Sequence, residues 1–145
     1  MAETLPMKPR ILVIDEDLLF SVRVETTLQK SGYDVYVTSS PEEALEVARE
    51  NPLSLVIFNY GREALKPMET TTRLKALYQP APVLGFLSHK LIPGVREAAR
   101  EAGCDLLVAN SALMLRLAKL VEKLAPLDGS VSQIVEAEEF ADEEE

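Results

Sequence analysis

The chain has 145 residues, of which 47% are hydrophobic and 27% charged; this is the balance of a globular protein large enough to bury one core. It contains a single cysteine, Cys104, which excludes an internal disulfide and indicates a reducing compartment. No apolar stretch reaches the length of a membrane span, and residues 1–6 lack the pattern of a secretory signal. We therefore expect a cytoplasmic protein with one folded domain.

The formal net charge of −9 is unevenly distributed along the chain. Residues 128–145 contain eight acidic residues and no basic one, whereas residues 1–127 contain sixteen acidic and fifteen basic residues. The body is almost neutral, and clustered Lys and Arg are what nucleic-acid binding requires, so we expect no nucleic acid among the partners. We expect a flexible leader over residues 1–8, a folded domain over 9–125 and an acidic, disordered tail over 126–145.

Strand-like and helix-like segments alternate from residue 10 onward. Strands are predicted from short apolar or β-branched runs, and helices from apolar residues that recur every three or four positions. The expected strands are 10–14, 33–37, 53–58, 83–87 and 105–108. The expected helices are 17–30, 41–50, 67–78, 92–102 and 112–124.

Local signals mark several helix ends. Ser40 precedes a proline and two glutamates, which together form a favourable helix start. Asp17 and Ser111 are expected to cap the first and last helices through their side-chain oxygens. Gly32 and Gly103 follow helices at positions where glycine accepts the left-handed conformation of a C-terminal cap.

Five strand–helix units predict a parallel sheet with helices on both faces. Right-handed crossovers make this a doubly wound α/β sandwich, and the flavodoxin-like strand order 2-1-3-4-5 is favoured. In that order the carboxyl ends of the first and third strands meet, at the edge where open α/β sheets place their sites. Asp15 and Glu16 follow the first strand and Asn59 follows the third, so we expect these side chains to share one pocket.

The pattern resembles the receiver domain of bacterial two-component response regulators over roughly residues 9–125. The most specific segment is 11–17, an apolar strand followed by acidic residues. Supporting segments are 31–35, 41–45, 82–84 and 102–105. Each segment is weak evidence alone, but their order and spacing together are characteristic. The resemblance implies a flavodoxin-like (βα)5 fold and a role in phosphorelay signalling.

In that family, two acids after the first strand help to bind magnesium and an aspartate after the third strand accepts a phosphoryl group. Asp15 and Glu16 match the acidic pair, but Asn59 stands at the acceptor position. An amide has no anionic oxygen to attack phosphorus, so the acyl-phosphate cannot form there. Magnesium prefers anionic oxygen ligands. We therefore expect no cofactor, with weak magnesium binding at Asp15 and Glu16 left open.

The family also uses a Ser or Thr after the fourth strand and a Lys after the fifth to respond to the phosphate. Here Leu87 stands at the hydroxyl position, with Ser88 one place late. Ala109 and Asn110 replace the usual Lys-Pro step, so a phosphoryl group would lose its cationic partner. These losses together predict a degenerate member of the family, a pseudo-receiver.

The last helix, 112–124, is more apolar than one core-facing side requires. One interpretation is that its apolar face simply packs on the sheet. The other is that the excess forms a surface for a protein partner or a homodimer, with Leu113, Leu117 and Val121 as the candidate residues.

In the acidic tail, Ile134, Val135 and Phe140 interrupt the charges with apolar side chains. Most such segments are solvated extensions. A minority fold on a basic partner that has an apolar groove.

The main hypothesis is a stand-alone receiver-like signalling protein that acts through protein–protein contacts without phosphorylation, and not an enzyme. The alternative is a working phosphorelay receiver that uses Asp15 or Glu16 as a substitute acceptor. A third hypothesis, an enzyme on a flavodoxin-like scaffold, has little support because the chain lacks a glycine-rich phosphate loop and a metal-spaced cluster of His, Cys and Asp.

Overall fold

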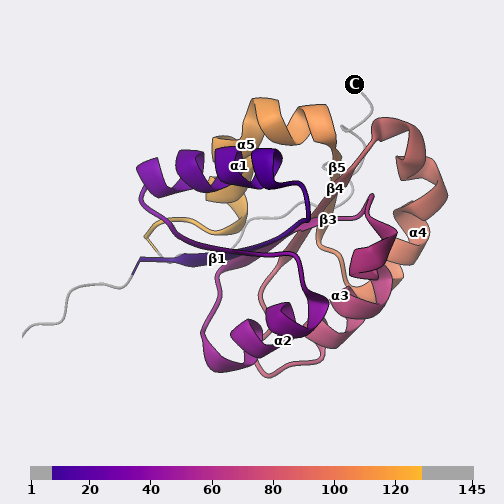
Figure 1. The fold of residues 1–145 in the computed structure, drawn as a ribbon, viewed down its shortest axis with the longest axis horizontal. Helices are drawn as coiled ribbons and strands as arrows, with labels where there is room; N and C mark the ends of the chain where they lie inside the picture. The colour runs from indigo at the N-terminus through magenta and orange to yellow at the C-terminus, as the bar shows by residue number, and fades with distance from the viewer. Residues whose placement is uncertain (1–7, 129–145) are drawn as a thin grey trace, which may run out of the picture.

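The computed structural model describes residues 8–128 and shows a parallel sheet between two layers of helices (Figure 1). The predictions for residues 1–7 and 129–145 lie outside the described residues. The strands are β1 (Arg10–Ile14), β2 (Asp34–Thr38), β3 (Leu55–Asn59), β4 (Val83–Leu87) and β5 (Leu106–Ala109). The helices are α1 (Leu18–Lys30), α2 (Pro41–Glu50), α3 (Pro67–Lys75), α4 (Ile92–Ala102) and α5 (Asn110–Leu124). Short 3₁₀ turns lie at Glu63–Leu65 and His89–Leu91.

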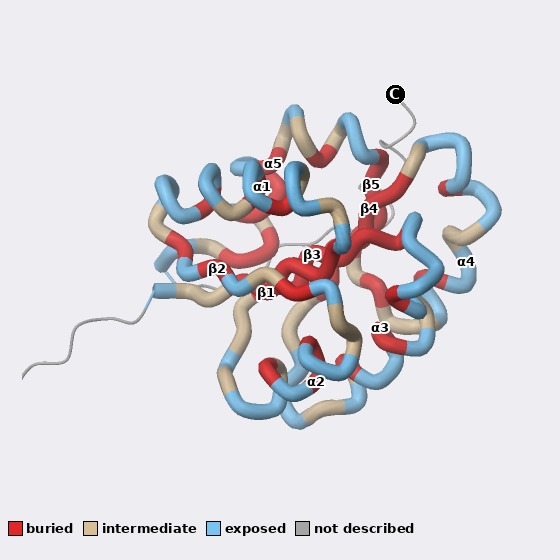
Figure 2. Tube along the Cα trace, in the orientation of Figure 1, coloured by how far each residue is buried: buried red, intermediate tan, exposed pale blue. Residues whose placement is uncertain are grey.

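The sheet has the order β2-β1-β3-β4-β5, and all neighbouring strands are parallel. This confirms the doubly wound α/β fold and the strand order expected from the sequence. β1 and β3 pair with Ile14 beside Phe58, so the residues that end or follow these strands meet at one edge. Every residue of β3, β4 and β5 is buried (Figure 2), as expected for strands covered on both faces.

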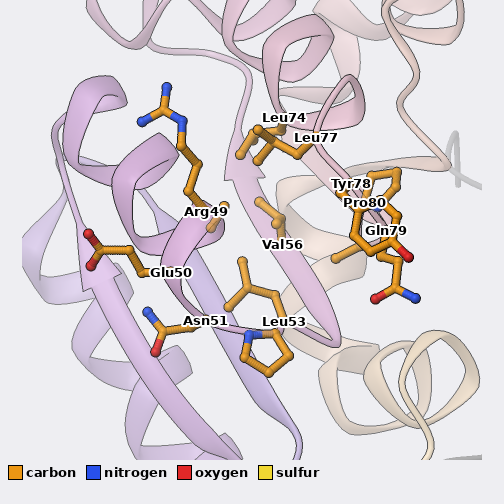
Figure 3. A pocket seen from close by; sticks show the side chains of 13 residues that line it. Arg49, Glu50, Asn51, Leu53, Val56, Leu74, Leu77, Tyr78, Gln79 and Pro80 are labelled. Carbon is orange, nitrogen blue, oxygen red and sulfur yellow. The ribbon is translucent and has the colours of Figure 1, made fainter.

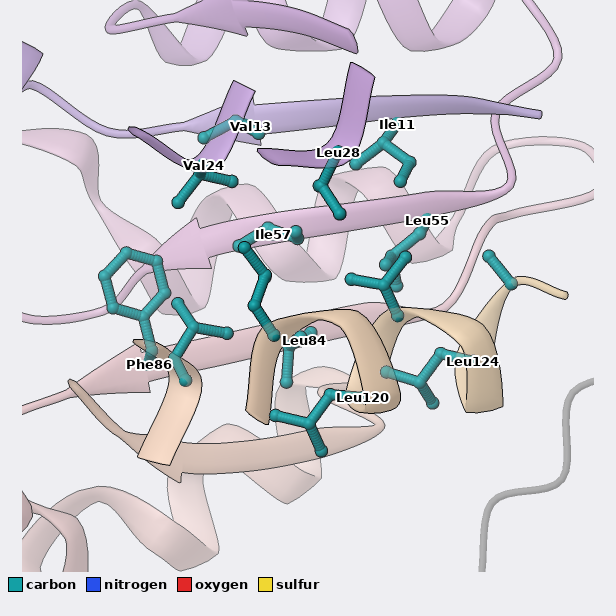
Figure 4. Packing of buried hydrophobic residues seen from close by; sticks show 14 of the residues in the cluster. Ile11, Val13, Val24, Leu28, Leu55, Ile57, Leu84, Phe86, Leu120 and Leu124 are labelled. Atoms are coloured by element: carbon teal, nitrogen blue, oxygen red, sulfur yellow. The ribbon is translucent and has the colours of Figure 1, made fainter. Parts of the chain in front are cut away.

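Two hydrophobic cores lie on opposite faces of the sheet because successive side chains of a strand point to opposite sides. Ile11 and Val13 of β1 contribute to the core under α1 and α5, whereas Leu12 and Ile14 contribute to the core under α2, α3 and α4. Figure 4 shows the first of these cores, in which strand residues face side chains from both helices. Within residues 8–128, no helix has the length and apolar character needed to cross a membrane.

Four of the predicted helix ends are confirmed. The carboxylate of Asp17 and the hydroxyl of Ser40 each accept the backbone N–H three residues on, at 3.1 Å. Gly32 after α1 and Gly103 after α4 have left-handed φ values of 106° and 110°. The predicted cap at Ser111 is wrong, because α5 begins as soon as β5 ends. Ala109 therefore holds the capping position, without a side-chain hydrogen bond, and the serine lies inside the first turn.

The third strand and third helix are shorter than predicted. β3 begins at Leu55, after a connection in which the Ser54 N–H already donates to the Arg10 carbonyl. α3 ends at Lys75, and Gln79 has a φ of 56° before Pro80. Ala76 is the C-terminal cap of α3, and the left-handed Gln79 followed by Pro80 excludes a continuation of the helix beyond residue 78.

The structure corrects the interaction surface proposed on the last helix. Leu113, Leu117 and Val121 are 0%, 4% and 0% exposed and belong to the core between α5 and the sheet. They lie on the side of the helix that β4 and β5 require for their own coverage, so they are not available to a partner. The apolar residue that α5 does present outward is Leu115, which is 84% exposed.

This contrast predicts different costs for two leucine truncations on one helix. Leu113→Ala is expected to lower the free energy of unfolding by about 2–5 kcal/mol because it leaves a cavity in the core. Leu115→Ala, the matched control, is expected to change it by less than about 0.5 kcal/mol. Urea denaturation of both variants measures the difference, and similar values for the two would contradict the assignment of the buried face.

Candidate functional site

The residues expected to share a pocket do meet at the carboxyl edge of the sheet. Asp15 directly follows β1 and Asn59 is the last residue of β3. The Asn59 Nδ2 group donates a hydrogen bond to Asp15 Oδ1 at 2.9 Å. Asn59 is only 8% exposed and Asp15 only 1% exposed. The asparagine is therefore a bonded, buried member of the site.

Both polar atoms of the Asn59 side-chain amide form hydrogen bonds. Its Oδ1 accepts the Gly61 N–H at 2.8 Å while its Nδ2 donates to Asp15. The orientation of the amide is fixed, because a backbone N–H can only donate and an ionised carboxylate can only accept. A carboxylate at this position could not donate to Asp15. The amide thus holds the acid of β1 and the loop after β3 in one arrangement.

Asp15 is stabilised on one oxygen only. Its Oδ1 also accepts the Asp17 N–H at 3.1 Å, whereas its Oδ2 is buried and has no hydrogen-bond partner among the described residues. Burial raises the pKa of Asp15 above its ordinary value, and the hydrogen bonds from Asn59 and from the Asp17 backbone oppose this rise. Ionisation of the Asp15 carboxyl is therefore less favourable in the folded protein than in water.

The neighbouring acids do not converge with Asp15. Glu16 is exposed to solvent. Asp17 uses Oδ1 to cap α1, and its Oδ2 lies 3.7 Å from an Arg62 guanidinium nitrogen. No group of three or more His, Cys, Asp or Glu suited to a metal ion occurs in residues 8–128. Despite the unpaired oxygen of Asp15, the residues present do not fit the magnesium site that the family resemblance implies.

The ends of β4 and β5 complete the edge with apolar groups. Leu87 and Ala109 are 1% and 3% exposed. A methyl group added to Gly61 would lie 3.6 Å from Leu87 Cβ, so the leucine packs beside the loop that Asn59 holds. Ser88 begins the short turn after β4 without a side-chain capping bond, and Asn110 is exposed. The two phosphate-sensing positions of the family are thus occupied by Leu87 and Ala109, which have neither a hydroxyl nor a positive charge.

Arg62 is a site residue that the sequence interpretation did not single out. It comes from the loop after β3, pairs with Asp17 and lowers the pKa of Asp15 through its charge. A cation of the protein itself therefore lies beside the acidic cluster. The signal that could have identified it is a basic residue three places after the acceptor position, in the loop that returns to this edge.

Tyr60 is the second residue that was missed. Its hydroxyl shares a 2.6 Å hydrogen bond with Thr71 of α3, and its ring lies on Gly85, where an added Cβ would be 3.1 Å from three ring atoms. Burial raises the pKa of Tyr60 above its ordinary value. Through this hydrogen bond, the backbone directly after Asn59 is attached to α3.

Cys104 lies in the same buried region and is structural. It is 3% exposed, and burial raises the pKa of its thiol to about 11. A thiol with so high a pKa is almost wholly protonated at neutral pH and is a poor nucleophile. Cys104 therefore contributes to packing in the core under α2, α3 and α4.

A separate hollow of about 630 Å³ lies at the opposite, amino-terminal end of the sheet (Figure 3). Its lining comes from the end of α2, the start of β3 and the segment after α3, and includes Leu53, Val56, Leu77 and Tyr78. Arg49 and Glu50 stand at its border with opposite charges. The hollow contains none of the residues predicted for the site, and it is not continuous with Asp15 and Asn59.

No family model matches the chain. It is similar in sequence to the transcriptional regulatory protein PrrA of Mycobacterium tuberculosis, with 29% identity over 124 residues, or 86% of this chain and 53% of that protein. It is also 29% identical over 98 residues to the transcriptional regulatory protein ZraR of Escherichia coli, which covers 68% of this chain and 22% of ZraR. The chain therefore spans about half the length of PrrA and less of ZraR.

Solved structures share the fold. The chemotaxis response regulator CheY4 of Vibrio cholerae superposes with a TM-score of 0.68 at 18% identity, over 79% of this chain and 99% of that one. A redox sensor of the streptococci, evolved from two-component response regulators, has a TM-score of 0.71 at 15% identity, over 80% of this chain and 50% of that one. The receiver domain of Saccharomyces cerevisiae Ssk1, crystallised with the histidine phosphotransfer protein Ypd1, has a TM-score of 0.73 at 13% identity, over 86% of this chain and 93% of that one. In sequence, residues 8–128 are thus similar to regulatory proteins such as PrrA and ZraR, and in fold they are similar to response-regulator receivers.

Proposed function

We propose that this receiver domain signals through protein–protein contacts without being phosphorylated. The observation that carries the proposal is the buried amide of Asn59, which donates to Asp15 and accepts from the Gly61 N–H. In an aspartate-based receiver this position supplies the nucleophile, and an amide cannot take that role. The contacts of Asn59 instead join the two segments that form the site.

The use of a substitute acceptor has less support. Asp15 is 1% exposed, and its Oδ1 already accepts two N–H groups, so its attack on a phosphodonor would require the site to open. Glu16 is exposed, but the region around it lacks the converging acids and the lysine that would support an acyl-phosphate. Radiolabel transfer from a histidine kinase, lost on Glu16→Gln or Asp15→Asn, would favour this alternative.

Two related structures support the proposed mode of action. The streptococcal redox sensors evolved from response regulators, so the fold has been adapted to other inputs. The Ssk1 receiver forms a complex with a signalling protein, which supports a protein as the partner. We assign this chain to a two-component type pathway in the cytoplasm, with no enzymatic activity and with its output delivered through a partner.

The first prediction from this proposal concerns phosphate mimics. Beryllofluoride, or acetyl phosphate, added with magnesium is expected to leave the amide NMR spectrum essentially unchanged, because residue 59 cannot be modified and the acids do not converge on a metal. A receiver with an aspartate at the acceptor position provides the positive control for the reagents. Saturable shifts at Glu16, Asn59 and Ser88 would contradict the proposal.

The second prediction restores the missing acid. Asn59→Asp places a second carboxylate in a buried site about 3 Å from Asp15 and removes its hydrogen-bond donor. We expect a loss of about 1–3 kcal/mol in unfolding free energy at neutral pH without divalent ions. Magnesium should recover part of that loss in the variant and none in the parent chain, as measured by thermal denaturation.

Asn110→Asp is the matched control for this experiment, because Asn110 is an exposed asparagine in the first turn of α5. It makes the same chemical change outside the pocket and should show no magnesium-dependent recovery. An equal response of both variants would mean that the added charge alone, and not its place beside Asp15, determines the effect.

The third prediction follows from the raised pKa of Asp15. A carboxyl whose pKa is higher in the folded than in the unfolded chain contributes stability at low pH and loses it as pH rises through the folded-state pKa. The unfolding free energy of the parent chain, relative to Asp15→Asn, should therefore fall from pH 4 to pH 7. Urea denaturation across this range measures the difference, and a flat or rising profile would contradict the burial cost assigned to Asp15.

A further inference from the structure

The outward face of the α1/α5 layer presents large apolar side chains to solvent. On α1, Leu18, Leu19 and Val22 are 73%, 82% and 53% exposed, and on α5 Leu115 is 84% exposed. Val22 lies one helical turn from both Leu18 and Leu19, so the three side chains are neighbours. The two helices lie side by side and both begin at the carboxyl edge of the sheet (Figure 1). The exposed apolar residues therefore share the half of the layer nearest to that edge.

The same two helices have a net positive charge, whereas the rest of residues 1–127 has a net negative charge. Together α1 and α5 contain five basic residues and two acidic ones, whereas the rest of residues 1–127 contains ten basic and fourteen acidic residues. The basic residues are Arg23, Lys30, Arg116, Lys119 and Lys123. A complementary ligand for this face is therefore acidic, with apolar residues at intervals.

The chain itself contains a segment of that chemistry. Residues 129–145 include seven acidic residues, no basic one and the large apolar residues Ile134, Val135 and Phe140. The charge of this segment is opposite to that of the α1/α5 layer, and its apolar residues match in kind the leucines and the valine exposed there.

The residues just before this segment, 125–127, are anchored at the far end of the same layer. The Tyr33 hydroxyl donates to the Ala125 carbonyl at 2.8 Å, and Leu127 packs so closely on Gly32 that a Cβ added there would lie 3.3 Å from Leu127 Cδ2. Both contacts join the segment after α5 to the chain just after α1. Residue 128 therefore leaves the domain at the carboxyl ends of the two helices.

The length of the segment matches the distance to the apolar residues. The thirteen residues of α1 span about 20 Å at about 1.5 Å per residue. An extended chain covers that distance in about six or seven residues. Ile134 and Val135 are seven and eight positions after Leu127, so they can reach Leu18, Leu19 and Val22. Tethering supplies an effective concentration of about millimolar for a short linker, so weak contacts suffice.

We propose that residues 129–145 bind in cis along the outward face of α1 and α5. Ile134 and Val135 cover the exposed apolar residues of that face, and the acidic residues lie beside its basic ones. The face is then covered until a competing partner displaces the segment. This inference concerns a surface outside the Asp15–Asn59 site and is independent of whether the domain is phosphorylated.

Paramagnetic relaxation in the full-length chain tests the proposal. A nitroxide is attached at Ala137→Cys; Cys104, which is buried and has a thiol pKa of about 11, is poorly reactive toward the label. We expect severalfold loss of amide peak intensity in the first half of α1 and around Leu115, with the amides of α3 and α4 unaffected. Uniform broadening over the surface, broadening centred on the hollow of Figure 3, or none would overturn the proposal.

Substitutions on both sides of the contact give the controls. Replacing Ile134, Val135 and Phe140 by Ser in the labelled chain should remove the broadening, as should Leu19→Ser combined with Leu115→Ser. Tyr78→Ser is the matched control, because Tyr78 is 90% exposed and lies beside the hollow on the other side of the sheet. It should leave the pattern unchanged. Broadening that persists in the serine variants would overturn the proposal.

A mixing experiment separates binding in cis from binding between two copies. A chain that is enriched in ¹⁵N and has no spin label is mixed with a spin-labelled chain at natural isotope abundance. Only contacts between molecules can then broaden the observed peaks. The proposal expects no broadening of α1 in this mixture. Broadening there would mean that the segment covers the face of a second copy, and would overturn binding in cis.

Discussion

The burial of the sheet on both faces is the constraint on which the rest of this structure depends. Every residue of β3, β4 and β5 is buried, so a polar group within these strands would lose water without a partner. Polar side chains are consequently restricted to the strand ends. In a parallel sheet those ends lie at one edge, and the order β2-β1-β3 brings Asp15 and Asn59 together there. The fold itself therefore selects the location of the site.

What occupies that edge determines what the domain can do. A carboxylate at residue 59 would repel Asp15 and would need a cation to neutralise the pair. The amide removes this need, since it donates to Asp15 and receives the Gly61 N–H. Arg62 supplies a positive charge from the protein itself. The site is thus satisfied internally, apart from one buried oxygen of Asp15, and requires no ion to hold its geometry.

Much of the fold could be predicted from the sequence because its signals are local. Apolar runs identified all five strands, and the capping residues Asp17, Ser40 and Gly103 identified helix ends. The predictions failed where a neighbouring element decides the outcome. Ser111 does not cap α5 because β5 runs directly into the helix, and Leu113 faces the core because the sheet lies beneath it.

The candidate site was predictable in its members but not in its contacts. The resemblance identified Asp15, Asn59, Leu87 and Ala109, which the fold places at one edge. The bond of Asn59 to a loop N–H and the pairing of Arg62 depend on the path of the loop after β3, which no local pattern specifies. The contacts of Tyr60 with Thr71 and of Arg62 with Asp17 are therefore visible only in the folded structure.

The packing of Tyr60 on Gly85 has a consequence for how this chain can vary. The ring fills the space that a side chain on β4 would occupy, and its hydroxyl is tied to Thr71. A larger residue at position 85 would force the tyrosine out and release the loop beside Asn59. Among descendants of this sequence, positions 60 and 85 should therefore change together, with a smaller residue at one accompanying a larger residue at the other.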